Sequence, residues 1–366
     1  MKKQTQFSGS TPPEIFVGEY GYPKINTGIL SPTEYGNTEK FSTPEYWFKN
    51  NLSIKEILNY RNQLLYARFQ TDIKKFNTKL KPSLDQVALS KKSISAEFTL
   101  SKPAIFSPIK DKSVPLIGHP APLTKIRLEE NPKIPTKVEY ISNDTKLKSM
   151  QGIKELYKFK TPVSNIIKVL SAGLLGLKNN RRMVPTKRAI TATDDTLSKQ
   201  MLEKIRFFPQ INEFQVFEAN FLGNYYQILL MPDIFSFEVI ELSELSPQNA
   251  SQDHETFSGK KKYAFNVTGA YYANRLALCE YLTKKQKQAT AIFFREIRPE
   301  YNSPMGVGIL RETSRHAFNK NPIKFQTLPE ALNHINSQLK TDINYYKNKS
   351  YILENFGKQQ RLSQWF

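Results

Sequence analysis

The chain has 366 residues, 39% of them hydrophobic, which is enough for a sizeable core and excludes a largely disordered protein. Its 53 basic and 33 acidic residues give a net charge of +20, which favours DNA or another nucleic acid as partner over an anionic membrane surface. Cys279 is the single cysteine, which excludes an internal disulfide framework and a cysteine-rich zinc site. No secretory signal follows Met1 and no run of ~18 apolar residues is present, so we expect a cytoplasmic, nucleoid-associated protein without membrane contact.

The first part of the chain is predicted to be mostly extended. Residues 1–14 indicate a disordered arm, and residues 15–135 an N-terminal region of short extended pieces broken by turns. Ser53 and Glu56 form a capping-box pattern, with apolar residues behind it near one helical face. This pattern predicts a helix over about 53–70.

Prolines, and later glycines, interrupt residues 103–176. Seven prolines within residues 103–135 predict an extended wrapping loop, or a boundary between two lobes, in place of a long regular element. Residues 145–175 then show a helical pattern, with Gly173 and Gly176 near its end.

A second helix and a hairpin are predicted next. Thr193, Asp194 and Asp195 precede an apolar stripe with a spacing of four residues, so we expect them to cap a helix that follows. Residues 214–221 and 225–231 are rich in aromatic and β-branched side chains and flank a Gly-Asn turn, which predicts a β-hairpin. Another strand is expected over residues 235–242.

The last third alternates polar and apolar stretches. Residues 243–262 lack periodicity and indicate an exposed insertion, whereas a helix around residues 272–282 places Cys279 in the core. Residues 289–297 and 306–311 are strand candidates, and 329–339 are a helix candidate. No internal repeat or coiled-coil heptad is present.

These elements predict an α+β fold. We expect a mixed or mainly antiparallel sheet flanked by helices, with residues 136–340 as the core domain. An extended proline-rich segment precedes this domain. Residues 341–358 would then form a tether or a partly helical segment, and residues 359–366 a peptide at the end of a flexible tail.

The final eight residues carry the most specific pattern. Gln359, Leu362, Trp365 and Phe366 occupy relative positions one, four, seven and eight, and one tight helical turn would bring the apolar side chains to one side. This is the pattern of a PCNA-interacting peptide, which binds the DNA sliding clamp. The alternative is that the aromatic pair docks on the protein's own core.

Residues 178–188, here named the basic segment, hold five basic residues and no acidic one. Arginine's fork matches phosphate oxygens, and a neighbouring threonine adds a neutral hydrogen bond. A solvated basic loop is the alternative. We expect nucleic-acid or phosphate contacts from Lys178, Arg181, Arg182, Thr186, Lys187 and Arg188.

Carboxylates near arginines form the candidate catalytic set. Asp194 and Asp195 follow the basic segment and could hold a divalent metal, although helix capping explains them better. Two Arg-Glu dipeptides are expected at strand ends, where buried arginines need acidic partners. Structural ion pairs are the commoner role for such residues. The other candidate catalytic residues are Arg275, Arg295, Glu296, Arg311 and Glu312, and the expected network would pair the three arginines with Glu218, Glu296 and Glu312.

Motifs of the common enzyme classes are absent from the sequence. No phosphate-binding loop ending in Gly-Lys-Ser/Thr, no Gly-x-Ser-x-Gly elbow and no His-Glu-x-x-His helix occurs. The four histidines are scattered, so we assign no metal ligand and no resident cofactor, and a divalent metal belongs only to the enzyme alternative.

Several short blocks of residues stand out along the chain. The blocks are Phe16-Val17-Gly18-x-Tyr20-Gly21-Tyr22-Pro23-Lys24, Glu130-Asn131-Pro132-x-Ile134-Pro135, Ser142-x-Asp144-Thr145, Leu170 to Gly176 with Asn180-Arg181-Arg182-x-Val184-Pro185-Thr186, Ile190-Thr191-Ala192-x-Asp194-Asp195-Thr196, Gly269-x-Tyr271-Tyr272-Ala273-x-Arg275-Leu276, Arg295-Glu296-Ile297, and Gly306-Val307 to Arg311-Glu312.

In these blocks, from about residue 10 onward, the chain resembles the archaeal DNA repair proteins of the Nre family. Members that this chain resembles often carry a cysteine-rich zinc finger, which is missing here, so no zinc is carried over. Where the family has Thr-Arg-Trp, this chain has Thr186-Lys187-Arg188, so no base-stacking tryptophan is expected there.

The leading hypothesis is therefore a DNA repair factor that binds DNA and is recruited to the sliding clamp by its C-terminal peptide. One alternative is a metal-dependent enzyme acting on nucleic acid or a nucleotide, which requires the carboxylates and arginines to converge in one cleft. The other is a clamp-associated scaffold without DNA contact, which requires the positive charge to be dispersed.

Overall fold

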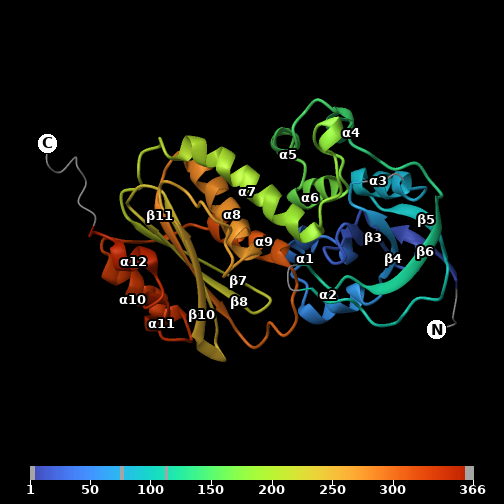
Figure 1. The fold of residues 1–366 in the computed structure, drawn as a ribbon. Coiled ribbons are helices and arrows are strands. Elements are labelled where there is room, and N and C mark those ends of the chain that lie inside the picture. Colours follow the sequence, from blue (N-terminus) through green and yellow to red (C-terminus); the bar gives the residue numbers. More distant parts are fainter. Residues whose placement is uncertain (1–4, 75–77, 112–113, 359–366) are drawn as a thin grey trace. The chain divides into compact units, whose positions relative to one another are not determined.

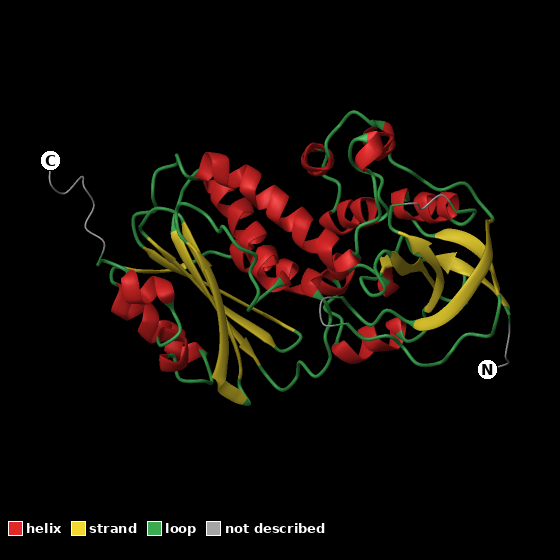
Figure 2. Ribbon diagram, viewed as in Figure 1, coloured by secondary structure: helices red, strands yellow, loops and turns green. Residues whose placement is uncertain are grey.

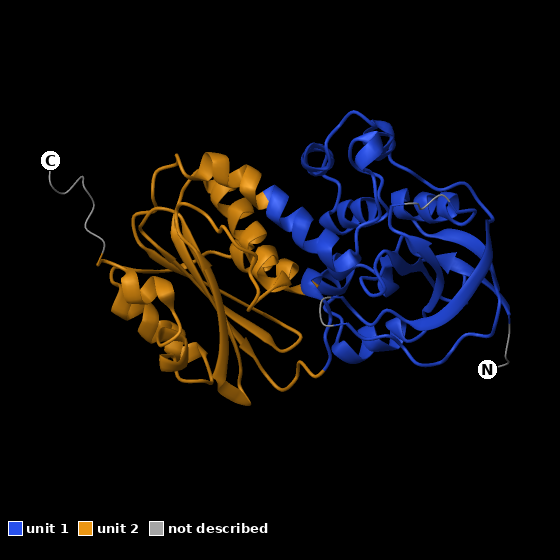
Figure 3. Ribbon diagram, in the orientation of Figure 1, with its two compact units in different colours: residues 1–197, 303–308 blue, residues 198–302, 309–366 orange. Residues whose placement is uncertain are grey.

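The computed structural model describes residues 5–74, 78–111 and 114–358 (Figures 1 and 2). The chain forms two compact units (Figure 3). Unit 1 contains Met1–Leu197 and Ser303–Gly308, and unit 2 contains Ser198–Asn302 and Ile309–Phe366. Each unit has its own six-stranded sheet with both parallel and antiparallel pairs, which confirms the predicted α+β class.

The sheet of unit 1 has the strand order β1-β5-β6-β4-β3-β2, in which β4 and β6 are the parallel neighbours. Strand β5 shows why these segments are strands, since Ile94, Ala96, Phe98 and Leu100 alternate with half-buried residues and line the core. The strands are β1 (Gln6–Thr11), β2 (Ile15–Val17), β3 (Lys24–Ser31), β4 (Leu65–Asp72), β5 (Ile94–Leu100) and β6 (His119–Leu128).

Short helices complete unit 1. The capping box of Ser53 and Glu56 is present and starts α2, as the sequence predicts, but the helix ends at Arg61, because the chain turns there into β4. The helices are η1 (Glu39–Phe41), α1 (Pro44–Lys49), α2 (Ile54–Arg61), α3 (Lys81–Leu89), α4 (Thr136–Asn143), α5 (Ser149–Lys158), α6 (Val163–Ser171) and η2 (Lys178–Asn180). Helix α7 (Thr186–Ile205) begins in unit 1 and ends in unit 2.

Two strands of unit 1 lie where none is predicted. Residues 6–11 of the expected arm form β1, because they pair with β5 and the Phe7 ring stacks on Phe98 at 4.5 Å. The proline-rich stretch contains β6, because the carbonyls of Pro120 and Pro122 accept hydrogen bonds from the loop after β5. Both prolines lack an N–H group. This costs no hydrogen bond with β5, because β5 has already ended beside them.

The sheet of unit 2 has the strand order β10-β9-β11-β8-β7-β12, with β9 and β11 parallel. The predicted hairpin is present, with Gly223 at φ +74° in its turn. The strands are β7 (Phe214–Phe221), β8 (Asn224–Met231), β9 (Ser236–Ser243), β10 (Ser246–Glu255), β11 (Thr290–Ile297) and β12 (Ile323–Phe325).

Helices cover both faces of this sheet (Figures 1 and 2). Alternation along β11 sends Ile292 and Phe294 to the C-terminal helices, whereas Phe293 packs toward Phe318 of α9 on the other face. The helices are α8 (Gly269–Lys285), α9 (Val307–Asn319), α10 (Leu328–Gln338), α11 (Asn344–Lys347) and α12 (Tyr351–Asn355). None of the helices in the described ranges is long and apolar enough to cross a membrane.

Two predictions for the second half of the chain are wrong. The expected strand at 306–311 is the start of α9, because β-branched side chains also occur in buried helices and Gly306 at φ +79° sets the turn before it. The expected insertion at 243–262 contains the edge strand β10, whose outward side chains are polar. Of the two alternatives for residues 341–358, the structure has the partly helical one, since α11 and α12 bury Tyr346 and Ile352 against the sheet.

Candidate nucleic-acid interface

The basic segment leaves the C-terminus of α6 and leads into the N-terminus of α7. Gly173 and Gly176 adopt φ +78° and +120°, which reverses the chain after α6. A Cβ at Gly173 would lie 2.7 Å from the Arg182 carbonyl oxygen, so the reversal packs the segment tightly against its own start.

Two residues of the basic segment hold the local fold together. Arg181 donates from Nε to the Gly176 carbonyl at 2.9 Å and from Nη2 to the Asp144 carbonyl at 3.0 Å. Burial lowers the pKa of Arg181 from its ordinary value, although an arginine remains charged. The Thr186 hydroxyl accepts from the Val17 N–H at 2.9 Å, which ties β2 to the start of α7. Both residues are therefore engaged within the protein.

Lys187 and Arg188 share one carboxylate. The Lys187 Nζ lies 3.4 Å from one Glu19 oxygen and the Arg188 Nε lies 3.8 Å from the other. The Arg188 side chain is 62% exposed and that of Lys187 is 40% exposed. One glutamate thus offsets part of the charge of two exposed cations, and a surface pair of this kind is weak.

Lys178 and Arg182 are the exposed cations of the basic segment whose charge is not offset. Both are exposed, and neither forms an ion pair with any residue in the described ranges. Together with Arg188 they form what we name the cationic surface. All three are exposed, and arginine and lysine side chains of this kind bind phosphate oxygens.

Asp194 and Asp195 do not cap a helix. Helix α7 begins at Thr186, so both aspartates lie in its interior, and Asp194 is fully buried. Pro185 stands just before the first residue of α7, and this start signal outweighs the capping preference of the aspartates. Among the described residues, no three His, Cys, Asp or Glu side chains gather as metal ligands would.

The first Arg-Glu dipeptide lies at the end of β11, as predicted, and both side chains are buried. Arg295 binds Glu241 at 2.5 Å and the Asn224 side chain at 2.6 Å. Glu296 accepts from Arg298 at 2.7 Å and from the Thr341 N–H at 2.8 Å. Each residue therefore has structural partners of its own.

The second dipeptide lies in a helix. Arg311 is 2% exposed in α9, and Glu312 binds Arg315 at 2.7 Å. The Glu218 carboxylate lies 2.8 Å from His334. The expected pairing is thus wrong for Arg275 and Arg295, which bind Glu255 and Glu241 instead of Glu218, Glu296 or Glu312.

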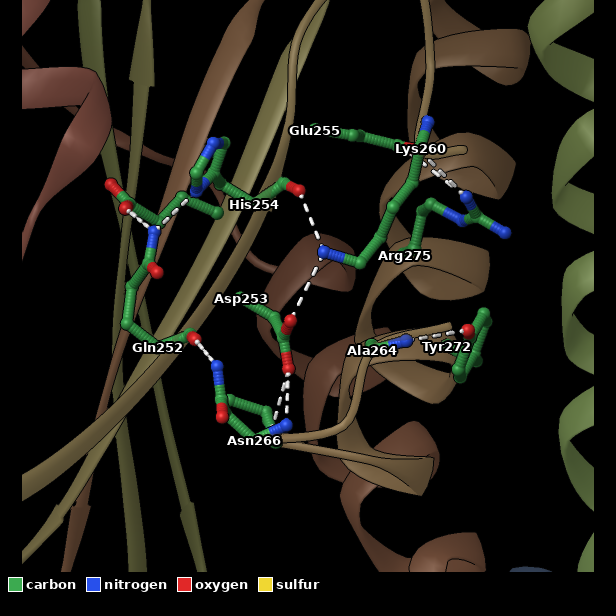
Figure 4. A network of polar contacts seen from close by, with 11 residues as sticks. Gln252, Asp253, His254, Glu255, Lys260, Ala264, Asn266, Tyr272 and Arg275 are labelled. Atoms are coloured by element: carbon green, nitrogen blue, oxygen red, sulfur yellow. Dashed lines mark hydrogen bonds and ion pairs between the residues drawn. The ribbon is translucent and has the colours of Figure 1, made fainter. Parts of the chain in front are cut away.

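The partner of Arg275 is Glu255, which the sequence reasoning missed. The Arg275 Nη1 donates to both carboxylate oxygens, at 2.9 and 3.1 Å, and both side chains are 1% exposed (Figure 4). The Ser198 hydroxyl accepts from Arg275 Nε at 3.1 Å. The signal available in the sequence was the period-two spacing of Asp253 and Glu255, both of which β10 turns inward.

The same region anchors residues 256–268, which we name the aromatic-basic loop. Asp253 accepts from the N–H groups of Asn266 and Val267 at 2.9 and 2.8 Å (Figure 4). Lys260 Nζ binds Asp253 at 3.0 Å and the His254 carbonyl at 3.1 Å.

Tyr272 and Glu255 complete this anchoring. The Tyr272 hydroxyl accepts from the Ala264 N–H at 3.0 Å, and Glu255 accepts from the Lys260 N–H at 3.1 Å (Figure 4). The acceptors of the network are therefore used to fix a main chain, which is a structural role.

A cavity of about 330 Å³ lies between the C-terminal halves of α8 and α9 in unit 2. Arg315 lies in its wall and binds Glu280 through two contacts of 2.6 and 2.8 Å. Lys284, Lys285 and Lys320 also line it, and sequence reasoning did not single them out.

The predicted clamp-binding residues Gln359, Leu362, Trp365 and Phe366 lie outside the described residues. The helix before them is well anchored. The buried Glu238 carboxylate accepts from the Ser350 hydroxyl at 2.5 Å and from the Tyr351 N–H at 2.8 Å, at the N-terminus of α12.

Comparison with known proteins decides the family. The model of the archaeal Nre N-terminal region matches residues 1–246, and that of the archaeal Nre C-terminal region matches residues 255–365. The chain belongs to the Nre family. The family resemblance read from the motifs is thereby confirmed.

Relatives of this Nre protein are named DNA repair proteins. The DNA repair protein NreB of Archaeoglobus fulgidus is 34% identical over 97% of this chain and 90% of its own length. NreA of Haloferax volcanii is 30% identical over 93% of this chain and 85% of its own, and NreA of Archaeoglobus fulgidus is 30% identical over 91% and 85%. No solved structure matches the chain. These names support a role in DNA repair.

Proposed function

We propose that this Nre protein binds DNA through the cationic surface of Lys178, Arg182 and Arg188. The observation that carries the proposal is that Lys178 and Arg182 remain exposed without an acidic partner in the described ranges, while their neighbours are engaged internally. The net charge of +20 and the DNA repair names of the relatives support the same partner.

Recruitment to the sliding clamp is the second part of the proposal. The pattern of Gln359, Leu362, Trp365 and Phe366 supports it, because two adjacent aromatic anchors dominate the binding energy of a small interface. Clamp binding would compensate for modest DNA affinity by raising the effective concentration near DNA.

The test of DNA binding uses the full chain and a labelled duplex. Lys178→Ala with Arg182→Ala is expected to lower affinity and to reduce the slope of log K against log salt by about 1.8, since each lost phosphate contact contributes about 0.9. Lys146→Ala with Lys154→Ala is the matched control of equal charge change. If the wild type binds the duplex and the variant without Lys178 and Arg182 shows the same salt slope, the proposal that this surface binds DNA is refuted.

The test of recruitment removes residues 359–366 and measures clamp binding by calorimetry. We expect binding to disappear, and Trp365→Ala with Phe366→Ala to reproduce the loss. Clamp affinity equal to that of the full chain would refute this part alone. Incubation of the full chain with branched DNA and a divalent metal tests the enzyme alternative, because cleaved product would establish turnover.

A further inference from the structure

The aromatic-basic loop presents a second surface in unit 2, with a composition unlike that of the basic segment. It contains three consecutive lysines and no acidic residue. Lys261 and Lys262 are exposed, and neither pairs with an acid in the described part of the chain. Phe265 is 73% exposed and Phe257 is 38% exposed. Aromatic rings and unpaired cations therefore alternate along one short stretch.

The turn after α7 adds a further ring and cation beside the start of this loop. The Arg206 guanidinium lies 5.6 Å from the centre of the Phe257 ring, and its Nη2 lies 3.1 Å from where a Cβ of Gly259 would stand. The next residue, Phe207, is 86% exposed, which is the highest value among the large apolar side chains of the described residues. A single exposed ring is common, but several exposed aromatic side chains together with cations are typical of a binding surface.

The hydrogen bonds shown in Figure 4 hold the main chain of the aromatic-basic loop in place before any ligand binds. Asp253 and Tyr272 accept main-chain hydrogen bonds from residues 264, 266 and 267, so the part of the loop that carries Phe265 is fixed to β10 and α8. Lys260 is turned inward to Asp253, which leaves Lys261 and Lys262 as the outward cations. Binding then requires little ordering of the main chain, which is the main cost that a flexible loop would incur.

We infer that this surface, formed by the aromatic-basic loop with Arg206 and Phe207, binds single-stranded DNA. The inference rests on the proposed DNA-binding function and names the form of DNA. Exposed rings stack on bases, and bases are accessible to stacking in a single strand but are already stacked in a duplex. The lysines between the rings neutralise phosphates along the same strand. A purely electrostatic duplex surface does not need the phenylalanines.

The test measures fluorescence anisotropy of a labelled thymidine oligomer and of a labelled duplex of equal length with the full chain. Phe207→Ala and Phe265→Ala are each expected to raise the single-strand Kd about tenfold, the size of one lost stacking contact, and to leave the duplex Kd unchanged. Tyr140→Ala, which removes a 68% exposed ring from unit 1, is the matched control. Phe207→Leu keeps the apolar bulk and is expected to reproduce the loss, because stacking needs a π face.

Substitution of Lys261 and Lys262 tests the phosphate contacts separately from the stacking contacts. Lys261→Ala with Lys262→Ala is expected to reduce the salt slope of single-strand binding by about 1.4, since each phosphate contact to a single strand contributes about 0.7. Thermal melting checks that these surface variants remain folded.

The outcomes separate the two proposals. If the phenylalanine variants bind the single strand as the wild type does while duplex binding depends on Lys178 and Arg182, this inference is overturned and the proposed function stands. If the wild type binds neither form of DNA, both are overturned. If the variants instead convert a wild-type dimer to a monomer in sedimentation, the surface is a self-contact and the inference is overturned.

Discussion

The basic segment of unit 1 and the aromatic-basic loop of unit 2 are both rich in cations, but they use them differently. In the basic segment, Arg181 binds main-chain carbonyls and Lys187 shares Glu19 with Arg188. The positive charge that the segment exposes is therefore smaller than its sequence suggests. In the aromatic-basic loop, the inward Lys260 and the acids of the preceding strand β10 fix the main chain, so Lys261 and Lys262 remain outward. A count of basic residues therefore does not measure the charge available to a partner.

The largest expected effect concerns the support of the loop. Glu255→Gln removes the carboxylate that neutralises the buried Arg275, and we expect unfolding free energy to fall by about 3–5 kcal/mol, because an uncompensated charge stays buried. Urea denaturation measures it, with the exposed Glu203→Gln as the control. A loss no larger than that of the control would show that the network does not support the loop.

The next effect separates neighbours in the basic segment. Arg181→Ala leaves two carbonyls without their donor and is expected to cost about 1–3 kcal/mol of unfolding free energy. Arg182→Ala removes an exposed side chain and should change stability by about 0.5 kcal/mol or less. Chemical denaturation of both variants is the measurement, and equal losses would contradict the division of roles.

A smaller effect concerns Glu19. Glu19→Gln releases Lys187 and Arg188 from their shared acid, so we expect duplex DNA to bind about two- to fivefold more tightly, the scale of a weak surface pair. Anisotropy at constant salt measures the change, with Glu139→Gln on α4 as a control of equal charge. Weaker binding than in the control would indicate that Glu19 itself supports the interface.

The smallest effect is a pH dependence near the loop. Burial, with Lys260 nearby, lowers the pKa of His254 below its ordinary value of 6.5. Below pH 6.5, His254 binds a proton in the unfolded chain but stays neutral in the folded protein until the pH reaches its lowered pKa. The unfolding free energy therefore falls as pH decreases from about 6.5 through the lowered pKa. His254→Gln should flatten the dependence between pH 5 and 7 in denaturation experiments. A steeper dependence in the variant would contradict this sign.

Local patterns predicted the fold better than they predicted the candidate sites. The capping box at Ser53 and the hairpin at Gly223 were readable because neighbouring residues determine them. The strand β1 and the helix α9 were not, since pairing with β5 and burial in a helix depend on distant residues. Likewise, the sequence indicated Arg275 as a buried cation, and the spacing of Asp253 and Glu255 could have indicated two inward acids. Their pairing depends on the fold, because Glu255 is twenty residues away from Arg275 on an edge strand.

Glu238 anchors α12 to the sheet of unit 2, and this anchoring has a consequence for the proposed clamp-binding residues 359–366. Helix α12 ends at Asn355, so only three residues of the chain separate this anchored helix from residue 359. If residues 359–366 bind the sliding clamp, as proposed above, only a short stretch of chain would connect the clamp to unit 2. So short a connection would restrict the orientations that the clamp and unit 2 can take toward each other.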